Sequence, residues 1–122
     1  MRIVRSIRHK SCADGTLMKE FVLSAPLTRE FFSYLREFGE VTAMPGVGEG
    51  FYTFDKPDCF SIKGFAGDTT VEVRFRREAM DLTTDFLYSL FALYRDGDPD
   101  FQTLKRREAA LMTRVHEHLY GR

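Results

Sequence analysis

Apolar and charged residues alternate along residues 69–76, TTVEVRFR. Successive side chains of a β-strand point to opposite faces of its sheet, so the two valines and Phe75 share one face, and Glu72 shares the other with two arginines. One apolar and one polar face are typical of an antiparallel sheet that is covered on one side only. The pattern therefore predicts a strand with one buried and one solvent-exposed face.

Further stretches have extended patterns bounded by turn residues, so that five to six strands are predicted in all. Two turns are well marked, Ala13-Asp14-Gly15-Thr16 and Ala66-Gly67-Asp68, because glycine readily adopts the positive φ that hairpin turns require. Ile3, Val4 and Ile7 in the first stretch also fit a helical stripe, which leaves a helix open there. The other predicted strands cover residues 2–10, 17–24, 40–44, 51–55 and 59–65.

A helix is predicted after the second strand. Thr28 is a good N-cap residue, since its side chain can accept a hydrogen bond from a free amide of the first turn. Gly39 is expected to end this helix. The apolar residues that recur at helical spacing between these two positions are Phe31, Phe32, Leu35 and Phe38.

Two more helices are predicted in the C-terminal third. The first covers residues 81–96, with Asp81 or Thr83 as its N-cap and a wide apolar stripe. Asp98 and Pro99 are then expected to be the N-cap and first residue of the final helix. The apolar side of that helix consists of Phe101, Leu104, Leu111, Met112, Val115 and Leu119.

The order of elements is strand, strand, helix, three to four strands, helix, helix. It predicts one α+β domain over residues 1–122, with a mainly antiparallel sheet and three helices packed on one face of it. The part from residue 19 to residue 94 is similar, in element order alone, to one half of a TATA-binding-protein-like fold or to a helix-grip domain. No sequence motif accompanies this similarity, so it implies no function.

The composition is that of a soluble globular protein with an unusual number of phenylalanines, 12 of 122 residues. The net charge is zero, which argues against strong non-specific binding of nucleic acid. No apolar run is long enough to span a membrane, and no export signal is recognisable. The two cysteines are therefore expected to be reduced thiols in a cytoplasmic protein.

The glycine-rich segment at residues 44–51, MPGVGEGF, is a candidate ligand-binding loop. Gly46, Gly48 and Gly50 do not match the phosphate-binding motifs, which also need a helix directly after the glycines. Here a strand follows instead. The segment is interpreted as a connection between two strands, and a lid over a bound ligand is the alternative.

No residue pattern indicates a catalytic group, a metal site or a cofactor. His9 and Cys12 form a single close pair, whereas a structural zinc site needs two. His116 and His118 are two positions apart in a helix and project in different directions. Cys59 is interpreted as a buried structural thiol, since nothing around it in the sequence would favour a thiolate. The sequence therefore favours a non-enzymatic binding domain and leaves an enzyme open.

The exposed side of the last hairpin is the main candidate for a binding surface. Lys63, Arg74 and Arg76 are expected to share one face of the sheet, joined by Arg5 of the first strand. Basic side chains beside an exposed aromatic such as Phe65 suit single-stranded nucleic acid. An ordinary solvated surface is the plainer interpretation of the same residues.

Two other functions are left open by the sequence. A phenylalanine-rich groove between the sheet and the helix at residues 81–96 could hold a small apolar ligand. Alternatively, the chain could be an assembly subunit, because its final helix is long for so small a sheet. We expect a homodimer formed through that helix, since two-fold dimers are the commonest oligomers.

Overall fold

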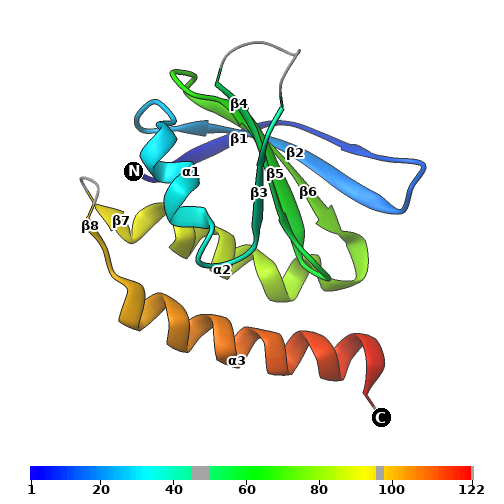
Figure 1. Ribbon diagram of the computed structural model, residues 1–122. Helices are drawn as coiled ribbons and strands as arrows, with labels where there is room; N and C mark the ends of the chain where they lie inside the picture. The colour runs from blue at the N-terminus through cyan, green and yellow to red at the C-terminus, as the bar shows by residue number, and fades with distance from the viewer. Residues whose placement is uncertain (45–49, 96–97, 122) are drawn as a thin grey trace.

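A computed structural model describes residues 1–44, 50–95 and 98–121 (Figure 1). Within these ranges the chain forms an antiparallel six-stranded sheet in the order β1-β2-β6-β5-β4-β3, and three α-helices. The predicted α+β class and element order are confirmed. The sheet strands are β1 (Ile3–Ser11), β2 (Thr16–Leu23), β3 (Glu40–Ala43), β4 (Phe51–Lys56), β5 (Phe60–Phe65) and β6 (Thr70–Arg76). The helices are α1 (Arg29–Leu35), α2 (Met80–Ala92) and α3 (Phe101–Tyr120).

The hydrophobic core lies between one face of the sheet and the helices. Every second residue of β5 and β6 is buried, as the alternating sequence predicts. Figure 1 shows α2 lying against the sheet and α3 running alongside α2, with α1 near the C-terminal end of α2. Aromatic rings fill much of the space, and the hydroxyl of Tyr34 in α1 donates to the carbonyl of Leu90 in α2 at 2.6 Å.

The predicted turns and the first helix cap are confirmed. Gly15 and Gly67 have φ values of +87° and +98°, which explains why both hairpin turns need glycine. The Thr28 side chain accepts a hydrogen bond from the Phe31 amide at 3.0 Å. The helix itself stops at Leu35, and a turn leads from there to Gly39.

The start of α2 differs from the prediction. A short 3₁₀-helix, Arg77–Ala79, runs directly from β6 into α2, so the N-cap position is Ala79, which makes no side-chain cap. Thr83 lies within the helix and its hydroxyl donates back to the Ala79 carbonyl at 3.0 Å. The prediction that Asp81 or Thr83 caps this helix is wrong because β6 continues into it without a loop.

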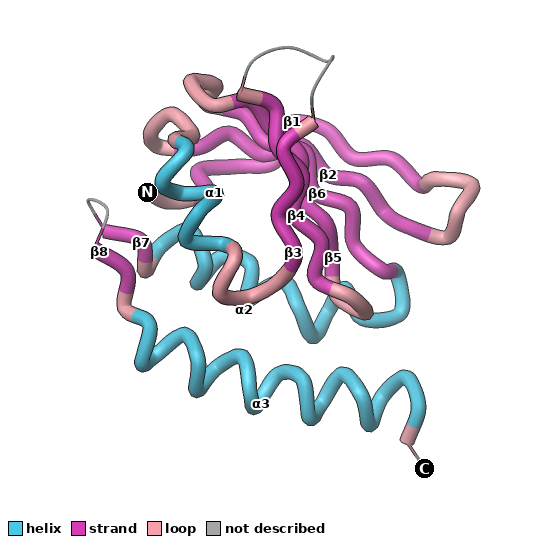
Figure 2. The backbone as a smooth tube through the Cα atoms, in the orientation of Figure 1, coloured by secondary structure: helices cyan, strands magenta, loops and turns pink. Residues whose placement is uncertain are grey.

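The start of α3 also differs by two residues. Asp98 and Pro99 form the short strand β8, which pairs with β7 (Tyr94–Arg95) in a second, two-stranded sheet (Figure 2). Asp100 is the N-cap instead, and its carboxylate accepts from the Thr103 amide at 3.1 Å. Within the described residues, neither α3 nor another helix combines the length and apolarity that crossing a membrane requires.

Removal of the α1 cap tests the local account of this helix. We expect Thr28→Ala to lower the free energy of unfolding by about 1 kcal/mol, since the Phe31 amide loses its partner. The measurement is urea denaturation followed by circular dichroism. Ser33→Ala in the same helix removes an exposed hydroxyl and should change stability by less than about 0.5 kcal/mol. Equal effects of the two substitutions would contradict the capping role.

Candidate nucleic-acid interface

The face of the sheet that the helices leave uncovered is built from rows of side chains across the strands. In one row, Thr53 of β4 is opposite Lys63, Lys63 opposite Glu72, Glu72 opposite Glu20, and Glu20 opposite Arg8 of β1. Residues directly opposite in antiparallel strands point to the same face. We call this surface the uncovered face.

All four predicted nucleic-acid-binding residues occupy strand positions whose side chains point to the uncovered face. Lys63 and Arg74 are both in register with residues of that face, and Arg76 follows Arg74 two positions later in β6. Arg5 is opposite Val22, which is itself opposite Thr70. The structure therefore places Lys63, Arg74, Arg76 and Arg5 on one side of the sheet, and their role there stays a prediction.

The two arginines of β6 are held by carboxylates. Arg74 lies 3.2 Å from Glu72, and this hydrogen bond raises the pKa of Arg74. The Arg76 guanidinium lies 2.6 Å from the Asp58 carboxylate and also donates to the Tyr120 hydroxyl at 3.1 Å. The hydrogen bond to Tyr120 is the main cause of the raised pKa of Arg76. A phosphate would have to compete with these partners for both guanidinium groups.

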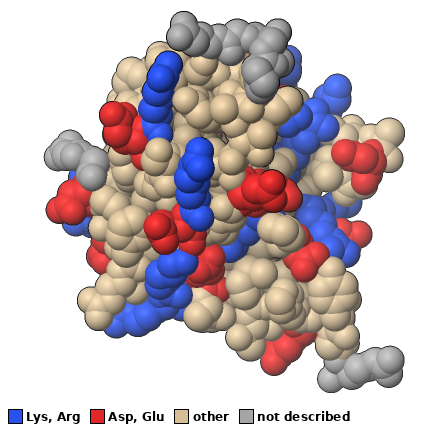
Figure 3. Space-filling model, viewed as in Figure 1, with Lys and Arg blue, Asp and Glu red and all other residues tan. Residues whose placement is uncertain are grey.

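Acidic side chains balance the charge of the uncovered face. Glu20 and Glu72 are directly opposite each other near its centre, and Arg8 lies 3.9 Å from Glu20. On the side of the molecule shown in Figure 3, basic and acidic side chains are likewise interspersed. A face of this kind lacks the single-sign field that attracts a nucleic-acid duplex. The sequence already placed Glu72 on this face, but it did not reveal that Glu20 lies opposite, because the register between β2 and β6 is a long-range feature.

An aromatic pair lies at one end of the uncovered face. The rings of Phe51 and Phe65, opposite each other in β4 and β5, have centroids 4.6 Å apart and are both half-buried. They line a shallow depression of about 260 Å³ together with Lys63. Among the described residues, Lys63 makes no ion pair, unlike Arg74 and Arg76. The remaining lining residues include Glu20, Asp68, Thr70 and Glu72.

A second depression of about 190 Å³ lies at the other end of β6. Its charged lining consists of Asp14, Asp55, Asp58 and Lys56 with the two arginines of β6. No group of three or more His, Cys, Asp or Glu in the described ranges is arranged to hold a metal ion. Two ion pairs join its lining residues, Arg74 with Asp14 at 4.0 Å and Arg76 with Asp58 at 2.6 Å.

The predicted lid lies mostly outside the described residues. Gly46 and Gly48 are among residues that the structure does not describe. Gly50 has a φ of +83°, which favours glycine, and its carbonyl accepts from the Ala66 amide at 2.8 Å. Gly50 thus joins the start of β4 to the turn after β5, beside the aromatic pair.

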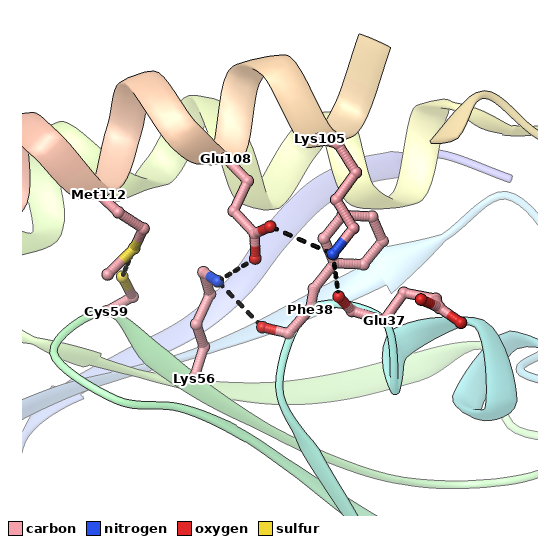
Figure 4. A network of polar contacts seen from close by, with 7 residues as sticks. All are labelled: Glu37, Phe38, Lys56, Cys59, Lys105, Glu108 and Met112. Carbon is pink, nitrogen blue, oxygen red and sulfur yellow. Dashed lines mark hydrogen bonds and ion pairs between the residues drawn. The ribbon is translucent and has the colours of Figure 1, made fainter. Parts of the chain in front are cut away.

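A buried ion pair ties α3 to the sheet (Figure 4). Lys56 ends β4 and is 5% exposed, and its ammonium group lies 2.6 Å from the Glu108 carboxylate of α3. The same group donates to the Phe38 carbonyl at 2.9 Å. Lys105 of α3 donates to the Glu37 carbonyl in the turn after α1. The sequence contained a signal for this, since Lys56 continues the inward positions of β4 after Phe54.

Cys59 lies under the same helix and has the character of a structural thiol. It is 1% exposed, and its sulfur contacts the sulfur of Met112 in α3 at 3.7 Å (Figure 4). Burial raises the pKa of the Cys59 thiol to about 11. A neutral, enclosed thiol is a poor nucleophile.

The C-terminal end of α3 is attached through the turn between β4 and β5. Asp58 there has a φ of +69°, and its carboxylate accepts from the Tyr120 hydroxyl at 2.6 Å. Arg76 donates to the same carboxylate oxygen, and His116 lies 3.8 Å from the other oxygen. These residues were not singled out as a group from the sequence, because they come from three distant parts of the chain.

The helix that would line the groove considered for an apolar ligand presents buried side chains to the sheet. Phe86, Leu87, Leu90 and Phe91 are each at most 4% exposed and belong to the same buried cluster as the inward residues of the sheet.

Comparison with protein-family models, curated proteins and solved structures finds no match for this chain. The geometry of the uncovered face is therefore the main guide to function.

Disruption of the buried ion pair tests the attachment of α3. We expect Glu108→Gln to lower the free energy of unfolding by about 3 kcal/mol, since the buried Lys56 ammonium loses its counter-charge. Glu117→Gln on the exposed side of α3 is the matched control and should have an effect below about 0.5 kcal/mol. Chemical denaturation measures both. A stability unchanged by Glu108→Gln would show that the ion pair does not hold the helix.

The reactivity of Cys59 provides a second test of the same region. In the Cys12→Ser variant, Cys59 is the remaining thiol, and we expect it to react with an aromatic disulfide about 100-fold more slowly in the folded protein than in denaturant. Absorbance of the released thiolate follows the reaction. Equally fast labelling of the folded protein would contradict the buried position under α3.

The raised pKa of Cys59 also predicts a dependence of stability on pH. The folded state keeps the proton up to about pH 11, whereas the unfolded thiol ionises near its ordinary value of 9.0. The contribution of the protonated thiol is therefore complete below pH 9.0 and lost as the pH rises towards 11. Cys59→Ala should lose less stability over this window than the wild type. An equal change in stability with pH in the two proteins would contradict the raised pKa of Cys59.

Proposed function

We propose that this protein is a binding domain that takes a short single-stranded nucleic acid on the uncovered face of its sheet. The observation that carries the proposal is the half-buried pair Phe51 and Phe65, which lines a depression next to Lys63. Aromatic rings on a sheet surface can stack with unpaired bases of any sequence. A positive side chain beside them can contact the phosphate of the stacked nucleotide.

The charges around the depression fit bases better than a continuous phosphate backbone. Glu20, Asp68 and Glu72 line it together with Lys63. Carboxylates accept hydrogen bonds from the amino groups of bases, whereas they repel phosphates. We therefore expect binding to depend mainly on stacking, with one or two phosphate contacts and a correspondingly weak dependence on salt.

The proposal assigns no catalytic step to the protein. Binding of an apolar ligand along α2 has less support, because the described side chains there are packed against the sheet. A cytoplasmic location, where both thiols stay reduced, is part of the proposal and fits the buried, protonated Cys59.

Substitution of the aromatic pair tests the proposed function. We expect Phe65→Ala to weaken binding of mixed-sequence single-stranded oligonucleotides by about 10-fold or more, because loss of one stacking ring costs about 1–3 kcal/mol. Lys63→Ala should weaken binding less and reduce the salt dependence by about one phosphate contact. Fluorescence anisotropy with labelled DNA and RNA oligonucleotides at several salt concentrations measures both effects.

Matched controls lie on the helical side of the molecule. Phe101 of α3 is 40% exposed, and Arg36 follows α1 at an exposed position. Phe101→Ala and Arg36→Ala should leave binding unchanged. Absence of binding to either kind of oligonucleotide, or equal losses in the control variants, would overturn the proposal.

A further inference from the structure

A surface groove of about 530 Å³ is lined by residues of both α2 and α3. Its floor is apolar, formed by Phe86 and Leu111, and Ala110 presents only a methyl group between the larger side chains of α3. A small residue at this position lets another helix approach closely. The polar residues that line the groove are Asp85, Ser89, Arg107 and Arg114.

The two rims of the groove carry opposite charges. The rim formed by α2 contributes the exposed Asp85, and Asp81, the other charged residue of α2, is an exposed acid one turn earlier in the helix. The rim formed by α3 contributes the exposed Arg107 and Arg114. Arg107 donates to the Ser89 hydroxyl at 2.7 Å. Among the described residues, Asp81, Asp85, Arg107 and Arg114 form no ion pair.

This charge pattern is self-complementary. An occupant of the groove must present a basic surface to α2 and an acidic surface to α3. A second copy does so when it is related by a two-fold axis along the groove, because its acidic α2 then faces the basic α3 of the first copy, and the reverse holds at the same time.

We infer that the groove between α2 and α3 is the interface of a homodimer. Asp85 of each subunit faces the arginine rim of the other subunit, so every favourable contact occurs twice. The uncovered face lies on the opposite side of the sheet from these helices and stays open in this dimer.

Charge reversal tests the interface by the molar mass in solution, measured with multi-angle light scattering across a dilution series. We expect the wild type to be a dimer, and D85R and R114D each to weaken dimerisation by about 100-fold, since each creates two like-charge contacts. The double variant D85R/R114D should regain the dimer, and an equimolar mixture of the two single variants should form a heterodimer. Recovery in the double variant also shows that the single variants fail by repulsion and not by misfolding.

The control is Glu30→Arg, a charge reversal at an exposed position of α1 that does not line the groove, which should leave the dimer intact. A wild-type monomer at all concentrations would overturn the inference. A dimer that persists in both D85R and R114D would overturn it as well, since another surface would then hold the subunits. Loss of oligonucleotide binding by Phe65→Ala tests the uncovered face separately and does not depend on this result.

Discussion

The arrangement of the helices depends on the buried ion pair between Lys56 and Glu108. An ammonium group at 5% exposure is unfavourable unless it has a counter-charge and a hydrogen-bond acceptor, and here α3 supplies the first and the Phe38 carbonyl the second. The pair contributes specificity of position more than net stability, because the desolvation of both charges offsets much of their attraction. It joins the end of β4 to α3, and in the same packing Met112 contacts Cys59 and Tyr120 donates to Asp58.

Much of the fold could be predicted from local sequence, because strand alternation, glycine turns and the Thr28 cap act over a few residues. Prediction was less accurate where several residues compete for one role. Asp98 and Asp100 can both cap a helix, and only the pairing of Asp98–Pro99 with Tyr94–Arg95 decides between them. The partners of Arg76 could not be predicted, since Asp58 and Tyr120 are distant in sequence, and Glu20 meets Glu72 only through the register of β2 with β6.

The structure changes the meaning of the predicted basic surface. The side chains that share the uncovered face are a mixed set, in which carboxylates hold the two arginines of β6 and Lys63 makes no ion pair within the described ranges. The feature that distinguishes one end of this face is the ring pair Phe51 and Phe65, of which only Phe65 was considered from the sequence. Aromatic surface, more than charge, is therefore what this face offers to a ligand.

One guanidinium group belongs to both sides of the molecule. Arg76 projects from β6 on the uncovered face, yet its partners Asp58 and Tyr120 attach the end of α3. A ligand that draws Arg76 towards the uncovered face would loosen the last turn of α3, and a partner that secures α3 would hold Arg76 away from such a ligand. For a ligand that contacts Arg76, thermodynamic linkage would make these two effects equal in free energy.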